Sequence, residues 1–207
     1  SKMPATICLA FTGASGMPYG VRLLECLLAA GCRVQLLYSQ VAQIVARQEI
    51  GLELPARASE ARASLQQRYA TLPGTLEVYG REEWFAPLAS GSNPPDAMVV
   101  CPCSMGTLAA IAQGLASRLI ERAADVVLKE GRKLVLVPRE TPLSAIHLEN
   151  MLRLSRAGAV ILPPNPGFYH HPRHVEDLVD FVVARILDQL QVSHTLLQRW
   201  GEAEPAR

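Results

Sequence analysis

Short apolar runs that alternate with helical segments are the feature that most constrains the fold of this chain. Nearly continuous apolar strands separated by helices are typical of a parallel sheet that is covered on both faces. Because parallel crossovers are right-handed, we expect an α/β fold, a single domain over residues 1–207 built on a doubly wound parallel sheet. The strands are expected at 5–11, 34–38, 97–101, 134–137 and 160–162, and the helices at 19–30, 40–48, 104–113, 119–130, 144–157 and 175–190.

The stretches 57–68 and 80–96 interrupt this alternation. The first is charged and helical, which is typical of a solvated surface helix. The second contains Trp84, Phe85 and several prolines and is predicted to be a long ordered loop. Loops of that length are often functional.

Charge and cysteine content exclude several classes of protein. The net charge of +1, from 20 basic and 19 acidic residues, gives no broad basic field for nucleic acid or an anionic membrane. No stretch approaches the ~20 apolar residues of a membrane span, and residues 1–4 lack the layout of a signal peptide. The 5 cysteines form neither a disulfide framework nor the paired C-x-x-C of a zinc site. We therefore expect a cytoplasmic protein with reduced, mostly buried thiols.

Small residues at 13–16 connect the first strand to the first helix. They let the backbone approach a ligand, and the helix N-terminus offers free N–H groups to an anion, which suits a phosphate. The segment is not the G-x-G-x-x-G dinucleotide fingerprint. A tight turn without a ligand remains the alternative on this motif alone.

Hydroxyl-bearing residues follow further strands. Segment 101–107 places Ser104 and Thr107 at the start of a helix, and Pro102 is expected to stop the strand before it. Ser39 follows the strand at 34–38 in the same way. These strand ends would share one crevice with segment 13–16. Alternatively, both serines simply cap helices.

Charged and aromatic residues follow the last strands. Arg139 and Glu140 come directly after the run at 134–137, where an arginine could bind phosphate and a carboxylate could move protons. Tyr169 lies in segment 167–172, above the sheet. Lys129 and Arg185 would by themselves be ordinary surface cations. No carboxylate cluster typical of a magnesium site is evident, because acids near a helix start, such as the pair Asp177 and Asp180, commonly complement the helix dipole.

In this order, these motifs resemble those of the UbiX-type flavin prenyltransferases, flavoproteins with a flavodoxin-like, Rossmann-like sheet. The resemblance spans most of the chain and is strongest in segments 89–92, 101–104, 121–126, 137–142 and 168–170. It implies a metal-independent transferase that joins the dimethylallyl group of dimethylallyl phosphate to N5 and then C6 of reduced FMN. It also implies a UbiD-type decarboxylase that receives the product, often in ubiquinone biosynthesis, and a large homo-oligomer, a dodecamer, with sites at subunit interfaces.

The resemblance also implies roles for single residues. FMN would be held by Gly13, Ala14, Ser15, Ser39, Ser104, Met105, Gly106, Thr107 and Arg139. The phosphate of the prenyl donor would be held by Lys129, Arg139, Tyr169 and Arg185. Trp84 is similar to an aromatic wall beside the allyl group, and Ser15 and Glu140 would relay protons. Glu49 and Trp200 are similar to supporting residues, the latter in a tail at 191–207 that closes the site.

Some positions depart from the family's usual pattern. Gln40 stands where many relatives have a lysine, and Gly131 and the segment 116–118 also differ. Alternative functions are an FMN-dependent decarboxylase of cysteine-containing substrates and a non-catalytic flavin carrier or regulatory subunit. The first typically has a catalytic histidine on an early helix, whereas the first histidine here is His147. A carrier would not need the cations of a second phosphate site.

Overall fold

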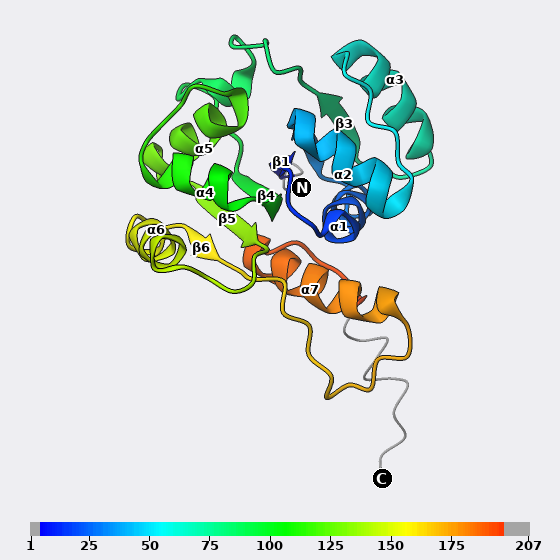
Figure 1. Cartoon of the computed structure of the whole chain (residues 1–207). Helices are drawn as coiled ribbons and strands as arrows, with labels where there is room; N and C mark the ends of the chain where they lie inside the picture. Colours follow the sequence, from blue (N-terminus) through cyan, green and yellow to red (C-terminus); the bar gives the residue numbers. More distant parts are fainter. Residues whose placement is uncertain (1–4, 197–207) are drawn as a thin grey trace.

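The computed structural model describes residues 5–196. Its strands form one six-stranded sheet with the order β3-β2-β1-β4-β5-β6 (Figure 1), and every neighbouring pair is parallel. The expected doubly wound sheet is confirmed, with one strand, β3, that the sequence analysis did not identify. The strands are β1 (Thr6–Phe11), β2 (Arg33–Tyr38), β3 (Thr75–Val78), β4 (Ala97–Cys103), β5 (Lys133–Pro138) and β6 (Val160–Ile161).

Helices cover both faces of the sheet. They are α1 (Met17–Ala29), α2 (Gln40–Ile50), α3 (Ala58–Arg68), α4 (Met105–Ala112), α5 (Leu119–Lys129), α6 (Ala145–Arg156) and α7 (Val175–Leu190), with a short 3-10 turn at Pro87–Ala89. The long loop expected at 80–96 is therefore largely without regular structure, apart from that turn. No helix among residues 5–196 is both long enough and apolar enough to cross a membrane.

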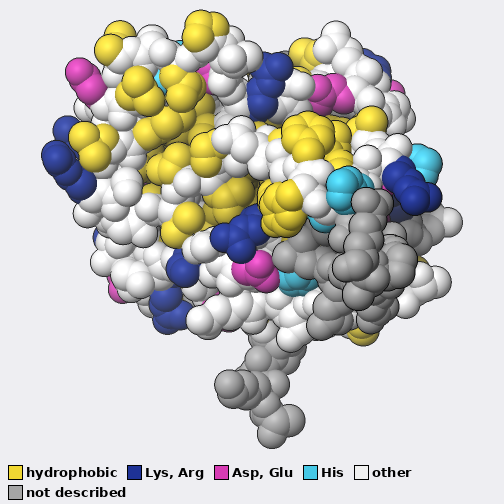
Figure 2. Space-filling model, turned by 90° about the horizontal axis from the view of Figure 1, so that it is seen from below, with side chains coloured by type: hydrophobic (Ala, Val, Ile, Leu, Met, Phe, Trp, Pro, Cys, Tyr) yellow, Lys and Arg dark blue, Asp and Glu magenta, His cyan; other side chains and the backbone are white. Residues whose placement is uncertain are grey.

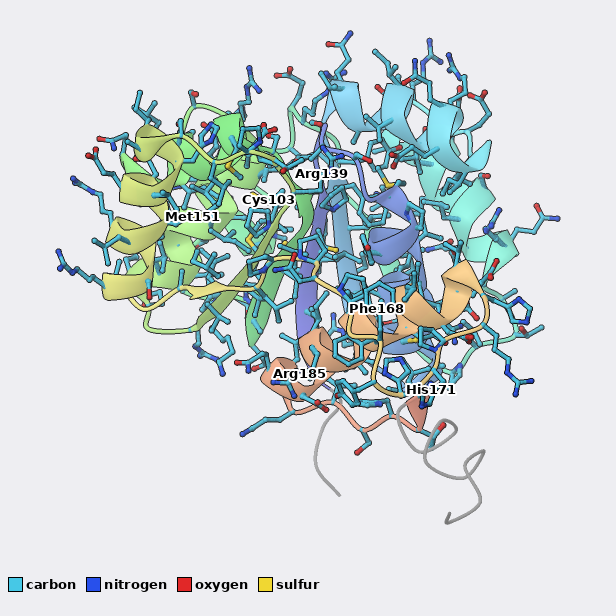
Figure 3. All side chains as sticks on the ribbon, turned by 60° about the horizontal axis from the view of Figure 1, so that its bottom comes forward. Cys103, Arg139, Met151, Phe168, His171 and Arg185 are labelled. Atoms are coloured by element: carbon cyan, nitrogen blue, oxygen red, sulfur yellow. The ribbon has the colours of Figure 1, made fainter. Side chains whose placement is uncertain are left out.

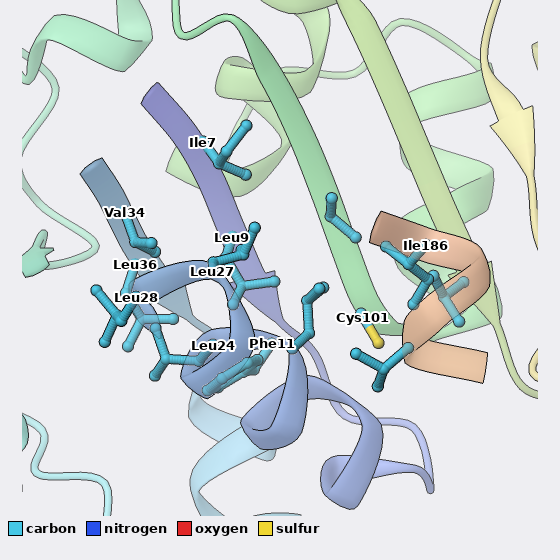
Figure 4. Close-up of a cluster of buried hydrophobic side chains, with 14 of the residues drawn as sticks. Ile7, Leu9, Phe11, Leu24, Leu27, Leu28, Val34, Leu36, Cys101 and Ile186 are labelled. Carbon is cyan, nitrogen blue, oxygen red and sulfur yellow. The ribbon is translucent and has the colours of Figure 1, made fainter. Parts of the chain in front are cut away.

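Alternation along β1 divides the core into two layers. Ile7, Leu9 and Phe11 point to the layer that contains α1, α2, α3 and α7 (Figure 4), whereas Cys8 and Ala10 point to the layer of α4, α5 and α6. Fully burying one large aliphatic or aromatic side chain contributes about 1.5–3 kcal/mol. Because both faces of the central strands are buried, their sequences are continuously apolar rather than alternating.

The strand order places a topological switch point between β1 and β4. The chain moves from β1 outward to β2 and β3, then crosses back to β4 and continues outward to β5 and β6. Connections leave β1 and β4 on opposite faces, so a crevice forms between them at their carboxyl ends, where open α/β sheets bind ligands. The segments that follow β1 and β4 therefore meet at one place.

Pro102 does not stop β4 as expected, since the strand runs on to Cys103. The register between β4 and β5 shifts between Val100 and Cys103, and a proline is tolerated at such an irregularity because its missing N–H is not needed there. The Pro102 carbonyl accepts hydrogen bonds from the backbone N–H and the hydroxyl of Thr12. These bonds tie the segment after β1 to the end of β4.

An ion pair joins α1 to α7. Nε of Arg22 lies 2.8 Å from Oδ1 of Asp180, whose side chain is 10% exposed. Asp177 acts as the sequence predicts, because it accepts the backbone N–H groups of Arg173 and His174 at the start of α7. Asp180 is instead a buried partner in helix packing.

Candidate active site

A pocket of about 810 Å³ lies at the carboxyl ends of the central strands. Its walls come from the ends of β1 and β2, the starts of α2, α4 and α5, and the segment after β3. The volume lies within the range of small-molecule and cofactor sites. The pocket brings together many of the residues that the sequence predicts to bind FMN or the prenyl donor, namely Gly13, Ser39, Trp84, Ser104, Gly106 and Thr107.

Two serine N-caps present hydroxyl groups at this pocket. Ser39 Oγ accepts the backbone N–H of Ala42 at 3.1 Å, and Ser104 Oγ accepts that of Thr107 at 3.1 Å. Ser104 also donates its proton to Thr107 Oγ1. Among residues 5–196, the hydroxyl protons of Ser39 and Thr107 have no acceptor, so both can donate to a ligand. Donors at two helix N-termini are suited to a phosphate group.

Gly13 allows the segment after β1 to lie directly against α2. A Cβ atom at this position would lie 2.4 Å from Cγ1 of Val41. Real atoms do not approach so closely, so any other residue would push the first turn of α2 away. The glycine therefore keeps one wall of the pocket narrow.

Glu49 fills the anion site at the start of α1. Its Oε1 accepts the N–H groups of Gly16 and Met17 at 2.9 Å each, and its Oε2 accepts the Ser15 hydroxyl at 2.6 Å. The N–H groups that the sequence analysis expected to be free for a phosphate therefore bind a carboxylate of α2. Burial raises the pKa of Glu49, but these hydrogen bonds and the charge of Arg139 outweigh burial and bring the pKa below its ordinary value.

Arg139 and Glu140 line a second hollow, of about 290 Å³, at the end of β5. Figure 3 shows Arg139 at this edge of the sheet, above the β4 residue Cys103. Glu140 Oε1 accepts the N–H of Thr141 at 3.1 Å, and the carboxylate is exposed. Arg139 is close enough to Glu49 for its charge to lower the pKa of that carboxyl. The second hollow therefore adjoins the start of α1.

Arg185 lines a third hollow, of about 320 Å³, which shares Pro163 and Asn165 with the second. The ring of Tyr169, which is 77% exposed, contacts Phe181 of α7 edge-on with the centroids 6.0 Å apart. Four of the predicted residues, Arg139, Glu140, Tyr169 and Arg185, therefore lie around neighbouring hollows.

Lys129 does not join these residues within one chain. It ends α5, lies against Gly91 and pairs with Glu130 at 3.0 Å. Lys129 comes just before β5 and Arg139 just after it, and six residues of strand at ~3.3 Å each put them about 20 Å apart. Within one chain, Lys129 and Arg139 therefore do not meet, and their shared role at one phosphate stays a prediction.

The remaining predicted residues are distributed unevenly. Trp84 lines the first pocket, whereas Glu140 lines the second, so one chain does not place them in the same hollow. Ala14 is buried, and Met105 packs against the core. Trp200 and most of the 191–207 tail lie outside the described residues.

Three further residues line the first pocket without having been predicted as site residues: Gln40, which was noted only as a departure from the family pattern, Tyr79 and Arg81. The latter two follow β3, a strand of only four residues, and their position depends on its pairing with β2. No local signal marks them. The Tyr79 hydroxyl donates to Glu77, and burial together with this bond raises the pKa of Tyr79.

Cysteines and acidic residues do not form a reactive cluster at the site. All 5 thiols are free, as expected, and burial raises the pKa of Cys103 to about 12. Such a thiol is not a nucleophile near neutral pH. Among residues 5–196, no group of three or more His, Cys, Asp and Glu side chains is placed to hold a metal ion.

Comparison with known proteins agrees with this geometry. The Flavoprotein family model matches residues 1–187. Flavin prenyltransferase UbiX of Pseudomonas aeruginosa is 57% identical over 199 residues, 96% of this chain and 95% of the relative.

Solved structures of similar sequence share the fold. AnUbiX (PadA1), in complex with FMN and dimethylallyl pyrophosphate, is 40% identical with a TM-score of 0.82, over 99% of this chain and 98% of the other. A dodecameric FMN-dependent UbiX-like decarboxylase from Escherichia coli O157:H7 is 45% identical with a TM-score of 0.80, over 91% and 96%. Because a family model and a close relative each match nearly the whole chain, the protein belongs to the Flavoprotein family and, within it, to the UbiX flavin prenyltransferases.

Proposed function

We propose that this protein is a flavin prenyltransferase that joins the dimethylallyl group of dimethylallyl phosphate to N5 and C6 of reduced FMN. The observation that carries the proposal is the 57% identity to a UbiX flavin prenyltransferase over 96% of the chain. A neighbour of similar structure was crystallised with both FMN and dimethylallyl pyrophosphate. The whole chain, residues 1–207, would act as one domain, its tail at 191–207 closing the site.

The first pocket fits FMN. The hydroxyls of Ser39 and Thr107 and the starts of α2 and α4 can bind its phosphate, and Gly13 leaves room for close approach. Reduced FMN supplies the two nucleophilic atoms of the reaction, N5 and C6. The protein's part is to hold the ring, exclude water and manage protons.

The second and third hollows suit the prenyl donor. Arg139 and Arg185 offer guanidinium groups that bind phosphate and stabilise the charge that develops on the leaving oxygens, and the Tyr169 hydroxyl can donate a hydrogen bond. Lys129 would reach this phosphate from a second copy of the chain. Trp84, from the first pocket, would likewise face the allyl group across an interface.

Proton transfer would fall to Ser15 and Glu140, with Glu49 supporting Ser15. Glu140 is exposed at the second hollow, and Glu49 holds the hydroxyl of Ser15 at 2.6 Å. Glu140 would accept or return the protons released as the flavin atoms change bonding. Ser15 would orient the reacting groups through its bond to Glu49.

The surface of the chain supports a homo-oligomer. Figure 2 shows a broad area of hydrophobic side chains on one face, and on α6 the side chains of Ile146, Leu148 and Leu152 are each more than half exposed. A patch of this kind typically marks a protein–protein interface. The E. coli neighbour is dodecameric, and we propose the same assembly here.

The product would serve another enzyme. A UbiD-type decarboxylase would receive the prenylated flavin, in ubiquinone biosynthesis or a related cytoplasmic pathway. The reaction would need no metal, because cationic side chains carry the charge of the donor's phosphate.

Anaerobic incubation with reduced FMN and dimethylallyl phosphate, followed by mass spectrometry of the released flavin, tests the proposal. We expect a mass gain of one isoprenyl unit, also in the presence of EDTA. A parallel incubation with the diphosphate identifies the preferred donor. Unmodified flavin recovered from protein that binds FMN would overturn the transferase assignment and favour a flavin carrier.

A further inference from the structure

Arg81 is a cation at the first pocket to which no role has been given. It follows β3, is exposed, and lines the pocket together with Ser39 and Thr107. Its Nη1 donates to Oε1 of Gln40 at 3.3 Å. Gln40 is the first residue of α2, next to the Ser39 cap, so this bond holds the guanidinium at the helix start whose donors face the pocket.

The charge of Arg81 is not cancelled by the protein. Among residues 5–196, no carboxylate forms an ion pair with it. Gln40 is a neutral acceptor, and it therefore orients the guanidinium without neutralising it. One of the five N–H groups of arginine is used by Gln40, and the others remain for a ligand.

The surroundings favour an anion at this end of the pocket. The charged residues that line it are Arg81, Arg118 and Glu82, so the lining carries a net positive charge. Arg118 is the residue before α5, on another wall, whereas Arg81 shares the α2 end with Ser39. A phosphate monoester carries about −1.5 to −2 charges near neutral pH. By itself, the partial positive charge at the helix N-termini would balance only part of this negative charge.

The electrostatic effect of Arg81 on a neighbouring tyrosine agrees with this position. Its charge acts on the hydroxyl of Tyr38, the last residue of β2, and opposes the burial that raises the pKa of Tyr38 to about 12. Arg81 thus lies beside both the end of β2 and the start of α2. The segment 80–96 carries it there from the neighbouring strand β3.

We propose that Arg81, held in place by Gln40, binds the phosphate of FMN and sets the preference of this enzyme for FMN over riboflavin. The inference rests on the proposed function, since it takes FMN as the flavin. Arg81 is then the residue that determines specificity for the phosphate, and Gln40 is the residue that positions Arg81 through one hydrogen bond.

Flavin affinity measured by fluorescence quenching tests this inference. Hydrogen bonds to charged groups contribute enough that Arg81→Gln should weaken FMN binding by about 10- to 100-fold. The affinity for riboflavin, which lacks the phosphate, should change by less than about twofold. Unchanged riboflavin binding also shows that the variant is folded. FMN binding should depend on salt concentration less in Arg81→Gln than in the unmodified protein, because a charge interaction has been removed.

Variants of the partner residue sharpen the test. Gln40→Glu should weaken FMN binding as Arg81→Gln does, because the new carboxylate would neutralise the guanidinium. Gln40→Lys in the Arg81→Gln protein should restore much of the affinity for FMN, because position 40 then supplies the positive charge that position 81 has lost. The matched control is Arg47→Gln. Arg47 lies on α2, as Gln40 does, but its guanidinium pairs with Glu53 outside the pocket. This variant should change the affinity for neither FMN nor riboflavin.

The outcomes separate the two proposals. An unmodified protein that binds no flavin would refute the proposed function itself. Unmodified protein that binds FMN, with Arg81→Gln binding it equally tightly and with the same salt dependence, would overturn the role of Arg81 alone. Equal losses for FMN and riboflavin would also overturn it, since a contact with the phosphate cannot affect both.

Discussion

Removal of the Glu49 carboxylate tests how the start of α1 is stabilised. Glu49→Ala deletes three hydrogen bonds, two from backbone N–H groups at 2.9 Å and one from Ser15 at 2.6 Å. Loss of a helix cap and of a negative charge at a helix N-terminus costs about 1–2 kcal/mol in total. For a domain of this size, that corresponds to a fall in Tm of about 2–8 °C.

Glu49→Gln separates geometry from charge. The amide oxygen can still accept the N–H groups of Gly16 and Met17, and the amide nitrogen can donate to Ser15 Oγ. We expect the fall in Tm of this variant to be about half that of Glu49→Ala, because only the charge is removed. Thermal unfolding by differential scanning fluorimetry, at one protein concentration because assembly affects Tm, measures both variants.

The contribution of Glu49 to stability depends on pH, and the direction of this dependence follows from its lowered pKa. The folded-state pKa of Glu49 lies below its ordinary value of 4.5. A group with a lowered pKa contributes its stability in full above the unfolded value and loses it as the pH falls through the folded value. The Tm difference between the unmodified protein and Glu49→Gln should therefore be full at pH 7 and shrink below about pH 4.5. A difference that stays constant with pH, or a Glu49→Ala protein as stable as the original, would refute the role of this carboxylate.

Other variants test the proton relay, the helix packing and the pocket wall. Glu140→Gln should bind FMN normally but make prenylated flavin about 10²- to 10⁴-fold more slowly by mass spectrometry; full activity would remove Glu140 from the relay. Arg22→Ala leaves the buried carboxylate of Asp180 unpaired and should cost about 3–5 kcal/mol in urea unfolding, whereas Arg22→Leu combined with Asp180→Leu should recover most of it. Gly13→Ala should destabilise the protein by about 1–3 kcal/mol, and adding Val41→Ala should relieve only part of the loss, because the Cβ of Val41 would still lie 2.7 Å from the new Cβ; full recovery would mean that the clash lies elsewhere.

The fold was largely predictable because its signals are local. Apolar runs marked each strand except β3, and Ser39 and Ser104 marked the starts of α2 and α4 as caps. The strand β3 was missed because it has only four residues, one of them Glu77. Pro102 was misjudged because whether a proline ends a strand depends on the pairing partner, which the sequence does not display.

By itself, the sequence determined the alternation of strands and helices and the cluster of hydroxyl-bearing residues where strands end, because both depend on neighbouring residues. Only the tertiary structure decided which side chains meet. It placed Glu49 at the start of α1 and Arg81 beside Gln40. These contacts depend on strand order and on the direction of each crossover, which join segments 30 or more residues apart, such as Ser15 and Glu49. Residue spacing along the chain carries no information about such distances, so packing alone decides them.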